Sequence, residues 1–246
     1  MTTFDPKFVE FADQIMRLSA SGPTEDELRH FLLEEREGTR VYYAPFDWIN
    51  RAAKVVIVGI TPGEHSMQTA FRAAASALRE GQTVEEASER AKRAGSFSNM
   101  RFIIADMLDE LGIPEKLGIG RSEELFTTRY ELLHPTSCVR YPVFVWSQKK
   151  RRWVNYTGHR PKLLKWDTSV RYIEEVLSEE LRQIPGALIV PCGRAVDSAL
   201  RHLLAKGMLE SRRCLFGFPH ASGANGHRMK FFLARRNQLR QTVAEW

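Results

Sequence analysis

Two short segments combine small residues with side chains that can donate or accept protons. The first is Gly-Ile-Thr-Pro-Gly at Gly59–Gly63, which follows the apolar run Val55–Val58. The second is Phe-Pro-His-Ala-Ser-Gly-Ala-Asn at Phe218–Asn225, which ends the apolar run Cys214–Phe218. Each pattern predicts a strand that turns at its carboxyl end into a small-residue loop, where ligands bind in open α/β sheets. We expect the two turns to enclose a small planar ligand.

The elements that must position these turns alternate along the chain. We expect buried strands at 55–60, 130–138, 187–191 and 214–219, with helices between them, and a surface loop at Ser147–Gly158. Such alternation predicts an α/β fold with a parallel sheet. Because no linker or repeat is visible, residues 1–246 are expected to form one domain, with a helical part at 1–50 packed on the α/β core.

Composition narrows the class of protein. The 246 residues are 43% hydrophobic and 27% charged, which is typical of a globular protein. The formal charge of +6 favours a polyanionic partner. Three cysteines without Cys-x-x-Cys spacing argue against a disulfide framework, a metal site or an iron–sulfur cluster, and no cofactor is expected. We see no signal peptide and no membrane-spanning run, so we expect a cytoplasmic monomer that does not bind membranes.

Four blocks, taken in order, resemble the uracil-DNA glycosylase superfamily. They are Gly59–Gly63, His134–Arg140, Leu188–Ala195 and His220–Asn225. The resemblance implies a three-layer α/β/α sandwich around a four-stranded parallel sheet. It also implies an enzyme that hydrolyses the N-glycosidic bond of a flipped-out pyrimidine.

The catalytic residues implied by the resemblance are His220, Thr61 and Glu64. His220 is expected to donate a hydrogen bond to the base carbonyl as negative charge develops on the leaving base. Thr61 stands where many relatives have Asp, Asn or Glu; its hydroxyl can orient a water but is a poor base. Glu64 has suitable acid–base chemistry, or it stabilises the following helix through the helix dipole, and both interpretations stay open.

The resemblance further implies which residues hold the base. Gly63 replaces an aromatic residue of the strictly uracil-specific branch, so a 5-substituted pyrimidine is expected to fit there. Alternatively, Gly63 serves only the backbone conformation. Phe71 is expected to stack on the base or to lie in the core. The full expected base-binding set is Gly59, Ile60, Gly63, Gln68, Phe71, His134 and Thr136.

Contacts to single- or double-stranded DNA are expected from two regions. One is the loop after His220, with Ser222, Gly223, Asn225, His227 and Arg228 near the minor groove. The other is the run Lys149, Lys150, Arg151 and Arg152, which is interleaved with aromatic residues or is simply a solvated charged loop. A closing helix from His227 is expected to turn Phe231, Phe232 and Leu239 toward the core.

The sequence therefore predicts a monofunctional DNA glycosylase acting on uracil or a modified pyrimidine, such as a hypermodified viral cytosine. Its role would be DNA repair or antiviral defence. The alternative is a catalytically silent nucleic-acid-binding module on the same fold. A phosphate loop at Gly59–Gly63 is disfavoured because the Lys-Ser/Thr ending is missing.

Overall fold

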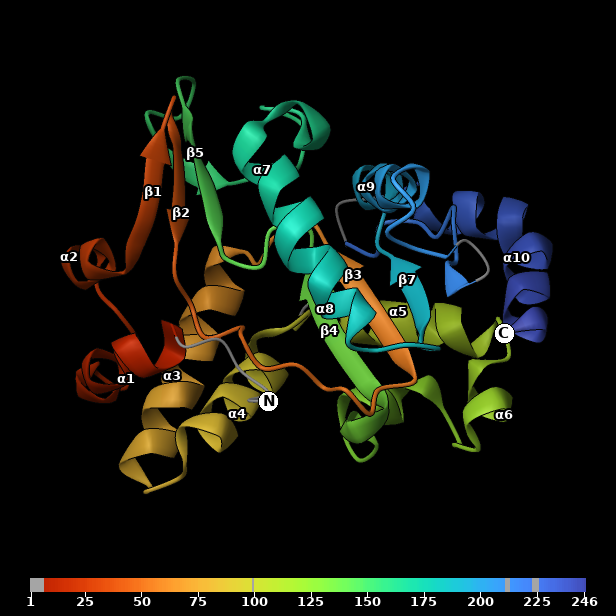
Figure 1. Cartoon of the computed structure of the whole chain (residues 1–246), viewed down its shortest axis with the longest axis horizontal. Helices are drawn as coiled ribbons and strands as arrows, with labels where there is room; N and C mark the ends of the chain where they lie inside the picture. Colours follow the sequence, from red (N-terminus) through yellow and green to blue (C-terminus); the bar gives the residue numbers. More distant parts are fainter. Residues whose placement is uncertain (1–6, 99, 211–212, 223–225) are drawn as a thin grey trace. The chain divides into compact units, whose positions relative to one another are not determined.

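A computed structural model of the chain describes residues 7–98, 100–210, 213–222 and 226–246 (Figure 1). The chain forms two compact units, each built from three separate segments. Unit 1 comprises Met1–Ile49, Thr61–Ser96 and Val139–Lys162, and unit 2 comprises Asn50–Ile60, Phe97–Cys138 and Leu163–Trp246. The chain passes repeatedly between the units, so no single position in the sequence separates them. The expectation that residues 1–246 form one domain stays a prediction.

Unit 1 combines an antiparallel sheet with helices. Its elements are α1 (Lys7–Arg17), α2 (Glu25–Leu28), the 3-10 turn η1 (Arg29–Phe31), β1 (Leu32–Arg36), β2 (Thr39–Tyr42), α3 (Glu64–Arg79), α4 (Val84–Gly95), β5 (Val143–Ser147) and β6 (Arg152–Asn155). The sheet has the strand order β1-β2-β5-β6, and every neighbouring pair is antiparallel.

The β1–β2 hairpin corrects the expectation that residues 1–50 are helical. A capping box at Thr24–Glu27 opens the short helix α2, with the Glu27 carboxylate accepting from the Thr24 N–H at 2.8 Å. The helix nevertheless ends at Leu28, and Leu32 begins a strand. At the hairpin turn Glu37 and Gly38 both have positive φ, 47° and 72°, as a tight two-residue turn requires.

A second hairpin, β5–β6, corrects the expectation of a loop at Ser147–Gly158. Residues 152–155 pair with β5, so only the charged tip between the two strands is a turn. Trp146 lies opposite Trp153, and their rings make an edge contact with centroids 5.6 Å apart. Cross-strand aromatic pairs of this kind stabilise a hairpin whose tip is hydrophilic.

The core of unit 1 is aromatic. Phe31 lies 4.7 Å from Phe71 between ring centroids, and Phe11 stacks on Tyr43 at 4.5 Å. Helices α3 and α4 pack against each other, and Gly95 allows this because an added Cβ would lie only 2.7 Å from the carbonyl oxygen of Ser66.

Unit 2 is an α/β unit built on a parallel sheet. Its elements are β3 (Val55–Gly59), α5 (Arg101–Asp109), α6 (Ile113–Leu117), the 3-10 turns η2 (Ser122–Phe126), η3 (Tyr130–Leu132) and η4 (Leu163–Lys165), β4 (Leu133–Ser137), α7 (Asp167–Arg171), the π-helical stretch η5 (Tyr172–Leu177), α8 (Ser178–Arg182), β7 (Leu188–Pro191), α9 (Arg194–Ala205) and α10 (Arg228–Glu245). In Figure 1, α8 passes in front of the sheet and α5 lies behind it.

The sheet of unit 2 has three strands in the order β4-β3-β7, all parallel. The apolar run Val55–Val58 is fully buried at its centre, as a strand covered on both faces requires. The expected fourth strand contributes a single parallel bridge, between Cys214 and Ile189. The α/β class and the parallel arrangement are thus present, with three full strands.

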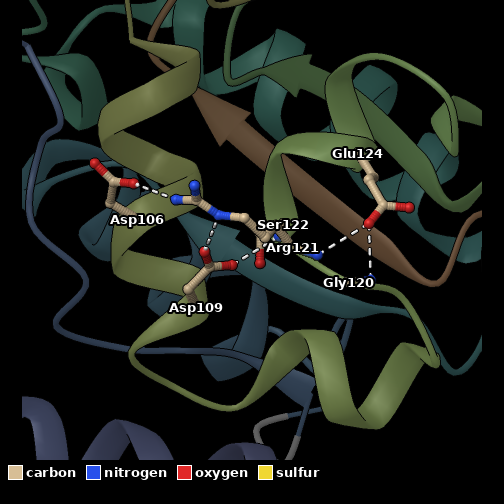
Figure 2. A network of polar contacts seen from close by, with 6 residues as sticks. All are labelled: Asp106, Asp109, Gly120, Arg121, Ser122 and Glu124. Atoms are coloured by element: carbon tan, nitrogen blue, oxygen red, sulfur yellow. Dashed lines mark hydrogen bonds and ion pairs between the residues drawn. The ribbon is translucent and has the colours of Figure 1, made fainter.

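Polar contacts fasten the segment before η2 to helix α5 (Figure 2). Arg121 donates to Asp106 and to Asp109, each at 3.3 Å. The Ser122 N–H donates to the second oxygen of Asp109 at 2.7 Å, and the Arg121 N–H donates to Glu124 at 3.0 Å. These carboxylates therefore replace the backbone partners that the turn lacks, and the cluster is structural.

The last helix, α10, buries only part of the expected apolar face. Phe232, Leu239 and Val243 are buried, whereas Phe231 is 50% exposed, which corrects its assignment to the core. Phe231 and Phe232 are adjacent in the sequence and point about 100° apart around the helix axis, so the two rings do not lie on the same side of the helix. No helix in the described part of the chain is long and apolar enough to cross a membrane.

Candidate active site

The carboxyl edge of the parallel sheet in unit 2 gathers the ends of three strands. Gly59 ends β3 and lies in register with Ser137 at the end of β4. On the other side of β3, the Cys192 N–H donates to the Val58 carbonyl, which brings Gly193 to the same edge. Neighbouring strands are about 4.8 Å apart, so Gly59, Ser137 and Gly193 form one continuous rim.

His220 lies beside this rim. An added Cβ on Gly193 would lie 2.8 Å from the Cβ of His220, and the Gly193 N–H donates to the Phe218 carbonyl at 3.2 Å. Gly193 has a φ of 95°, which side chains disfavour, so both conformation and close approach require glycine here. Gly193 is therefore a site residue beyond the expected set, and its place just after an apolar strand is a usable signal in the sequence.

The His220 imidazole is half-buried and is held by its own loop. Its Nδ1 accepts a hydrogen bond from the Ser222 N–H at 3.3 Å, so the neutral ring carries its hydrogen on Nε2. Burial lowers the pKa of His220 because a charged ring is poorly solvated there. Near neutral pH this residue is therefore an uncharged hydrogen-bond donor rather than a cation.

Asp197 braces the turn that precedes His220. Its carboxylate accepts from the Gly217 N–H at 2.6 Å and from Arg201 at 2.6 Å. The Arg201 guanidinium lies over the Phe216 ring, 4.1 Å from its centroid. Helix α9 thus fixes the segment that carries His220, although its residues never touch the imidazole in the contacts described.

The expectation that His134 reads a base is corrected by its position. His134 is fully buried near the amino end of β4, opposite Val56, three residues before the strand end at Gly59. Its Nδ1 accepts from the Asn50 N–H at 3.2 Å, and its Nε2 lies 2.6 Å from the buried Glu180 carboxylate. Three residues of strand span about 10 Å, so His134 lies away from the carboxyl edge and holds α8 against the sheet.

Two hydroxyls lie nearer to the edge. Thr136 is 6% exposed, and its Oγ1 has no hydrogen-bond partner among the described residues, which is unusual for a buried polar atom. The Ser137 Oγ lies 3.2 Å from the position that a Cβ on Gly59 would take. Ser137 is therefore a polar group at the rim that is not in the expected base-binding set, which contains its neighbours His134 and Thr136. Ile60, the last residue of this segment, is half-buried.

Thr61 belongs to unit 1, where its hydroxyl bridges two backbone groups. The hydroxyl donates to the Tyr141 carbonyl at 2.7 Å and accepts from the Val143 N–H at 3.1 Å. Its only proton is thus committed to the chain segment that enters β5. The residue acts here as a clamp between the first motif and the sheet of unit 1.

Gly63 is the N-cap of α3, and Asn155 supplies the cap that glycine lacks. The Asn155 Oδ1 accepts from the Glu64 N–H at 2.9 Å. A Cβ on Gly63 would lie 3.5 Å from the Asn155 Nδ2, so the side chain of Asn155 borders the space that was expected to receive a 5-substituent. The Glu64 side chain is exposed at the first turn of the helix. The role of Asn155 as a helix cap is not visible in the sequence, because Asn155 follows a charged run whose pattern predicts a loop.

Gln68 and Phe71 hold α3 in unit 1 and do not offer an open surface. The Gln68 Nε2 donates to the Pro23 carbonyl at 3.0 Å. Phe71 is fully buried against Phe31, so it takes the core role that was its stated alternative. Phe71 therefore has no free face for a stacked base in this structure, while Gln68 is half-buried.

The predicted DNA-binding cations Lys149, Lys150, Arg151 and Arg152 are all exposed at the tip of the β5–β6 hairpin. Several arginines of the described chain form ion pairs, but within the residues described these four cations make none. A compact, unneutralised patch of this kind attracts phosphate groups.

The loop after His220 is described in part. Ser222 is half-buried and donates to His220, as given above. Gly223 and Asn225 lie outside the described residues. His227 is exposed and meets the edge of Phe231 with 6.3 Å between ring centroids, while Arg228 begins α10 and is half-buried.

The described residues were compared with the requirements of a metal site and of a reactive thiol. In the residues that the structure describes, no group of three His, Cys, Asp or Glu side chains could hold a metal ion. The three cysteines are buried and free, and burial raises the pKa of Cys192 to about 12, which keeps that thiol protonated near neutral pH.

Comparisons with known proteins place the chain in a family. No family model matches it, and no solved structure matches it. It is 38% identical over 238 residues to the uncharacterized protein YoxB of Bacillus subtilis (strain 168), an alignment that covers 95% of this chain and 91% of that protein. The similarity thus runs through both units and includes both motifs. The chain belongs to the same protein family as YoxB.

Proposed function

We propose that the protein is a DNA glycosylase that hydrolyses the N-glycosidic bond of a flipped-out uracil or modified pyrimidine. The observation that carries the proposal is the state of His220. It is an uncharged imidazole with its hydrogen on Nε2, beside the carboxyl rim of a parallel sheet, in a chain that resembles glycosylases in four ordered blocks. A neutral donor suits a leaving group whose carbonyl oxygen gains charge only as the bond breaks.

The chemistry requires one bond to break and one to form. The electron pair of the bond between C1′ and the base nitrogen moves onto the pyrimidine, where His220 stabilises the charge on a carbonyl oxygen. Water adds to C1′, and its proton neutralises the departing base, which leaves an abasic site. Donors of this kind contribute about 10²–10³-fold to a rate when they are already oriented.

The rim supplies further groups that support base binding. Gly59 and Gly193 let Ser137 and His220 lie close to the rim, because an added Cβ would lie 3.2 Å from the Ser137 Oγ and 2.8 Å from the His220 Cβ. The buried Thr136 hydroxyl, which lacks a partner among the described residues, would gain one from a ligand. These features agree with a flat, polar ligand such as uracil or a 5-substituted or hypermodified pyrimidine. DNA repair and antiviral defence both follow naturally from such a substrate.

Glu64 is the proposed water-activating residue. Thr61 donates its only proton to the Tyr141 carbonyl, so its hydroxyl is poorly suited to serve as the base. Glu64 is the carboxylate directly after the first motif and is exposed. A Glu64→Gln variant keeps the side-chain shape and removes the basic oxygen, so we expect it to lower turnover with little change in DNA affinity.

The decisive test is base excision on a panel of oligonucleotides. Duplexes and single strands containing uracil, mismatched thymine or 5-modified cytosines are incubated with the protein and then treated with alkali, which cleaves abasic sites. We expect cleavage on at least one substrate, and its loss in His220→Ala. His202→Ala, a histidine of α9 that pairs with Glu174 instead, is the matched control and should keep full activity.

A silent nucleic-acid-binding module is the second candidate. It is favoured by the commitment of the Thr61 hydroxyl to backbone groups and by the four unpaired cations of the hairpin tip. Tight binding to DNA without an abasic site on any substrate of the panel would support the module and reject the enzyme.

A further inference from the structure

The exposed indole of Trp146 lies next to the unpaired cations of unit 1. Trp146 is 39% exposed, which is high for the largest apolar side chain. It lies on β5 directly before the tip that carries Lys149, Lys150 and Arg151. A large exposed aromatic ring beside unneutralised cations is the combination found on surfaces that bind single-stranded nucleic acid.

The register of the sheet defines which residues share the face of Trp146. Residues paired across antiparallel strands point to the same face, as do residues two apart on one strand. Trp146 pairs with Trp153, and Phe144 pairs with Asn155 and with Arg40. One face therefore presents, in order from the tip, the two tryptophans and then Asn155.

The inner members of this face are already occupied, which singles out Trp146. The Arg40 guanidinium lies 4.1 Å from the Trp153 ring centroid and pairs with Glu35 at 3.0 Å. Asn155 accepts from the Glu64 N–H at the start of α3. Trp153 is thus held between Arg40 and Trp146, and it supports the outer ring rather than offering its own face.

We propose that Trp146 stacks on an unpaired base while Lys149, Lys150 and Arg151 hold the adjoining phosphates, so that the hairpin is a single-strand DNA-binding site. The inference rests on the proposed function only in taking DNA as the partner. Bases of a closed duplex are stacked on each other, so an indole gains this contact only where a base is unpaired. The site therefore predicts higher affinity for single-stranded than for double-stranded DNA.

The composition of the hairpin tip favours DNA over a lipid surface. The tip between Ser147 and Arg152 contains only polar and charged residues, with nothing apolar to enter a bilayer. The tryptophans lie on the strands behind the tip and point to one face of the sheet. Membrane-binding segments instead place apolar side chains at the leading edge.

The test measures binding of the full chain to an end-labelled thymine oligonucleotide of about 15 nucleotides, and to a blunt duplex of equal length, by fluorescence anisotropy. Trp146→Leu removes the ring and keeps apolar bulk, and we expect it to weaken single-strand binding about 5- to 100-fold while duplex binding is unchanged. Trp146→Phe keeps an aromatic face and should retain most of the affinity. Unchanged duplex binding shows that the leucine variant is folded.

The cations are tested through the salt dependence. Replacing Lys149 and Lys150 with Gln should reduce the slope of log affinity against log salt by about 1.4 on a single strand. Replacing the exposed Lys54 and Lys165 with Gln changes the net charge equally and should leave the slope intact.

Three outcomes overturn the inference. They are an unchanged single-strand affinity in Trp146→Leu, an equal loss on both forms of DNA, and binding to phosphatidylserine vesicles but not to DNA. The oligonucleotide contains only normal thymine, so the assay does not require base excision. A protein that binds as predicted and forms no abasic site would reject the glycosylase alone.

Discussion

Two histidines of unit 2 occupy opposite ends of the same sheet and have opposite surroundings. His134 is fully buried near the amino end of β4, with one nitrogen bonded to the Asn50 N–H and the other to Glu180. His220 is half-buried at the carboxyl rim, and its Nδ1 is satisfied by its own loop through the Ser222 N–H. Both follow apolar runs in the sequence and were expected to contact the same base.

The difference shows how position along a parallel strand separates structural from functional polar groups. A histidine inside the strand must find partners within the protein, because water cannot reach it. At the carboxyl end the strand gives way to a loop, where a polar side chain can meet a ligand. His134 therefore belongs to the scaffold, and His220 is the candidate for chemistry.

The largest effect should come from His220→Ala. If the imidazole polarises the leaving base, its removal should lower excision by about 10²–10³-fold, with little loss of stability because the residue is half-buried. Single-turnover cleavage gives the rate, and thermal denaturation gives the stability. A variant that excises normally would place His220 with His134 among the scaffold residues.

Glu180→Ala should act on stability instead. It leaves the buried His134 without its carboxylate partner, and breaking such a buried pair costs about 3–5 kcal/mol in the free energy of unfolding. Chemical denaturation measures this change. Glu180→Gln keeps an acceptor oxygen for the His134 hydrogen and should lose clearly less. Equal losses in the two variants would show that packing, rather than the hydrogen bond, accounts for the cost.

Gly193→Ala should lower both the rate of excision and the stability. The added methyl would lie 2.8 Å from the His220 Cβ and would occupy a backbone conformation with φ of 95°. We expect a stability loss of about 1–3 kcal/mol from strain, together with a fall in excision as the loop shifts. Gly207→Ala, where φ is 70° and no atom lies within 4 Å, carries the strain without the contact. Equal excision in both variants would argue against close positioning of His220.

The smallest effect is a pH dependence. Burial lowers the pKa of His220 below its ordinary value of 6.5, so the unfolded chain binds a proton more readily than the folded chain. The contribution of neutral His220 to folding stability is complete at pH values above 6.5. It is lost as the pH falls through and below 6.5. Between about pH 7.5 and pH 5.5, the melting temperature of the native protein should fall more steeply than that of His220→Gln. Parallel curves would contradict the shift.

Much of the fold can be predicted from the sequence, because buried elements have recognisable patterns of apolar residues. The run Val55–Val58 is uniformly apolar and is a central strand. A helical segment expected between the strands at 130–138 and 187–191 is present as α7, η5 and α8. The two hairpins of unit 1 were missed. Their strands are only four or five residues long and all except β5 contain charged residues. The turn at Glu37 and Gly38 lacks the Asn-Gly or Asp-Gly pair that usually indicates such a hairpin.

The candidate site was predictable only where motif and strand end coincide. His220 and Gly59 stand at loop boundaries that the sequence makes visible. Gly193 is visible in the sequence as a glycine just after an apolar strand. Its contact with His220, like the contact of Asn155 with Glu64, joins residues far apart in the chain, and no local pattern indicates such contacts. The Thr61 hydroxyl has the same property, because its partners lie about eighty residues later.

The interleaved units carry a consequence for biosynthesis. A ribosome releases β3 long before β4 and β7, the two strands that flank it, and unit 1 waits for its second hairpin until the polypeptide has grown past Asn155. The apolar strand β3 is therefore exposed on the nascent chain without neighbours. Slowing translation would lengthen that interval, and a chaperone that shields extended hydrophobic segments would find its target at Val55–Val58.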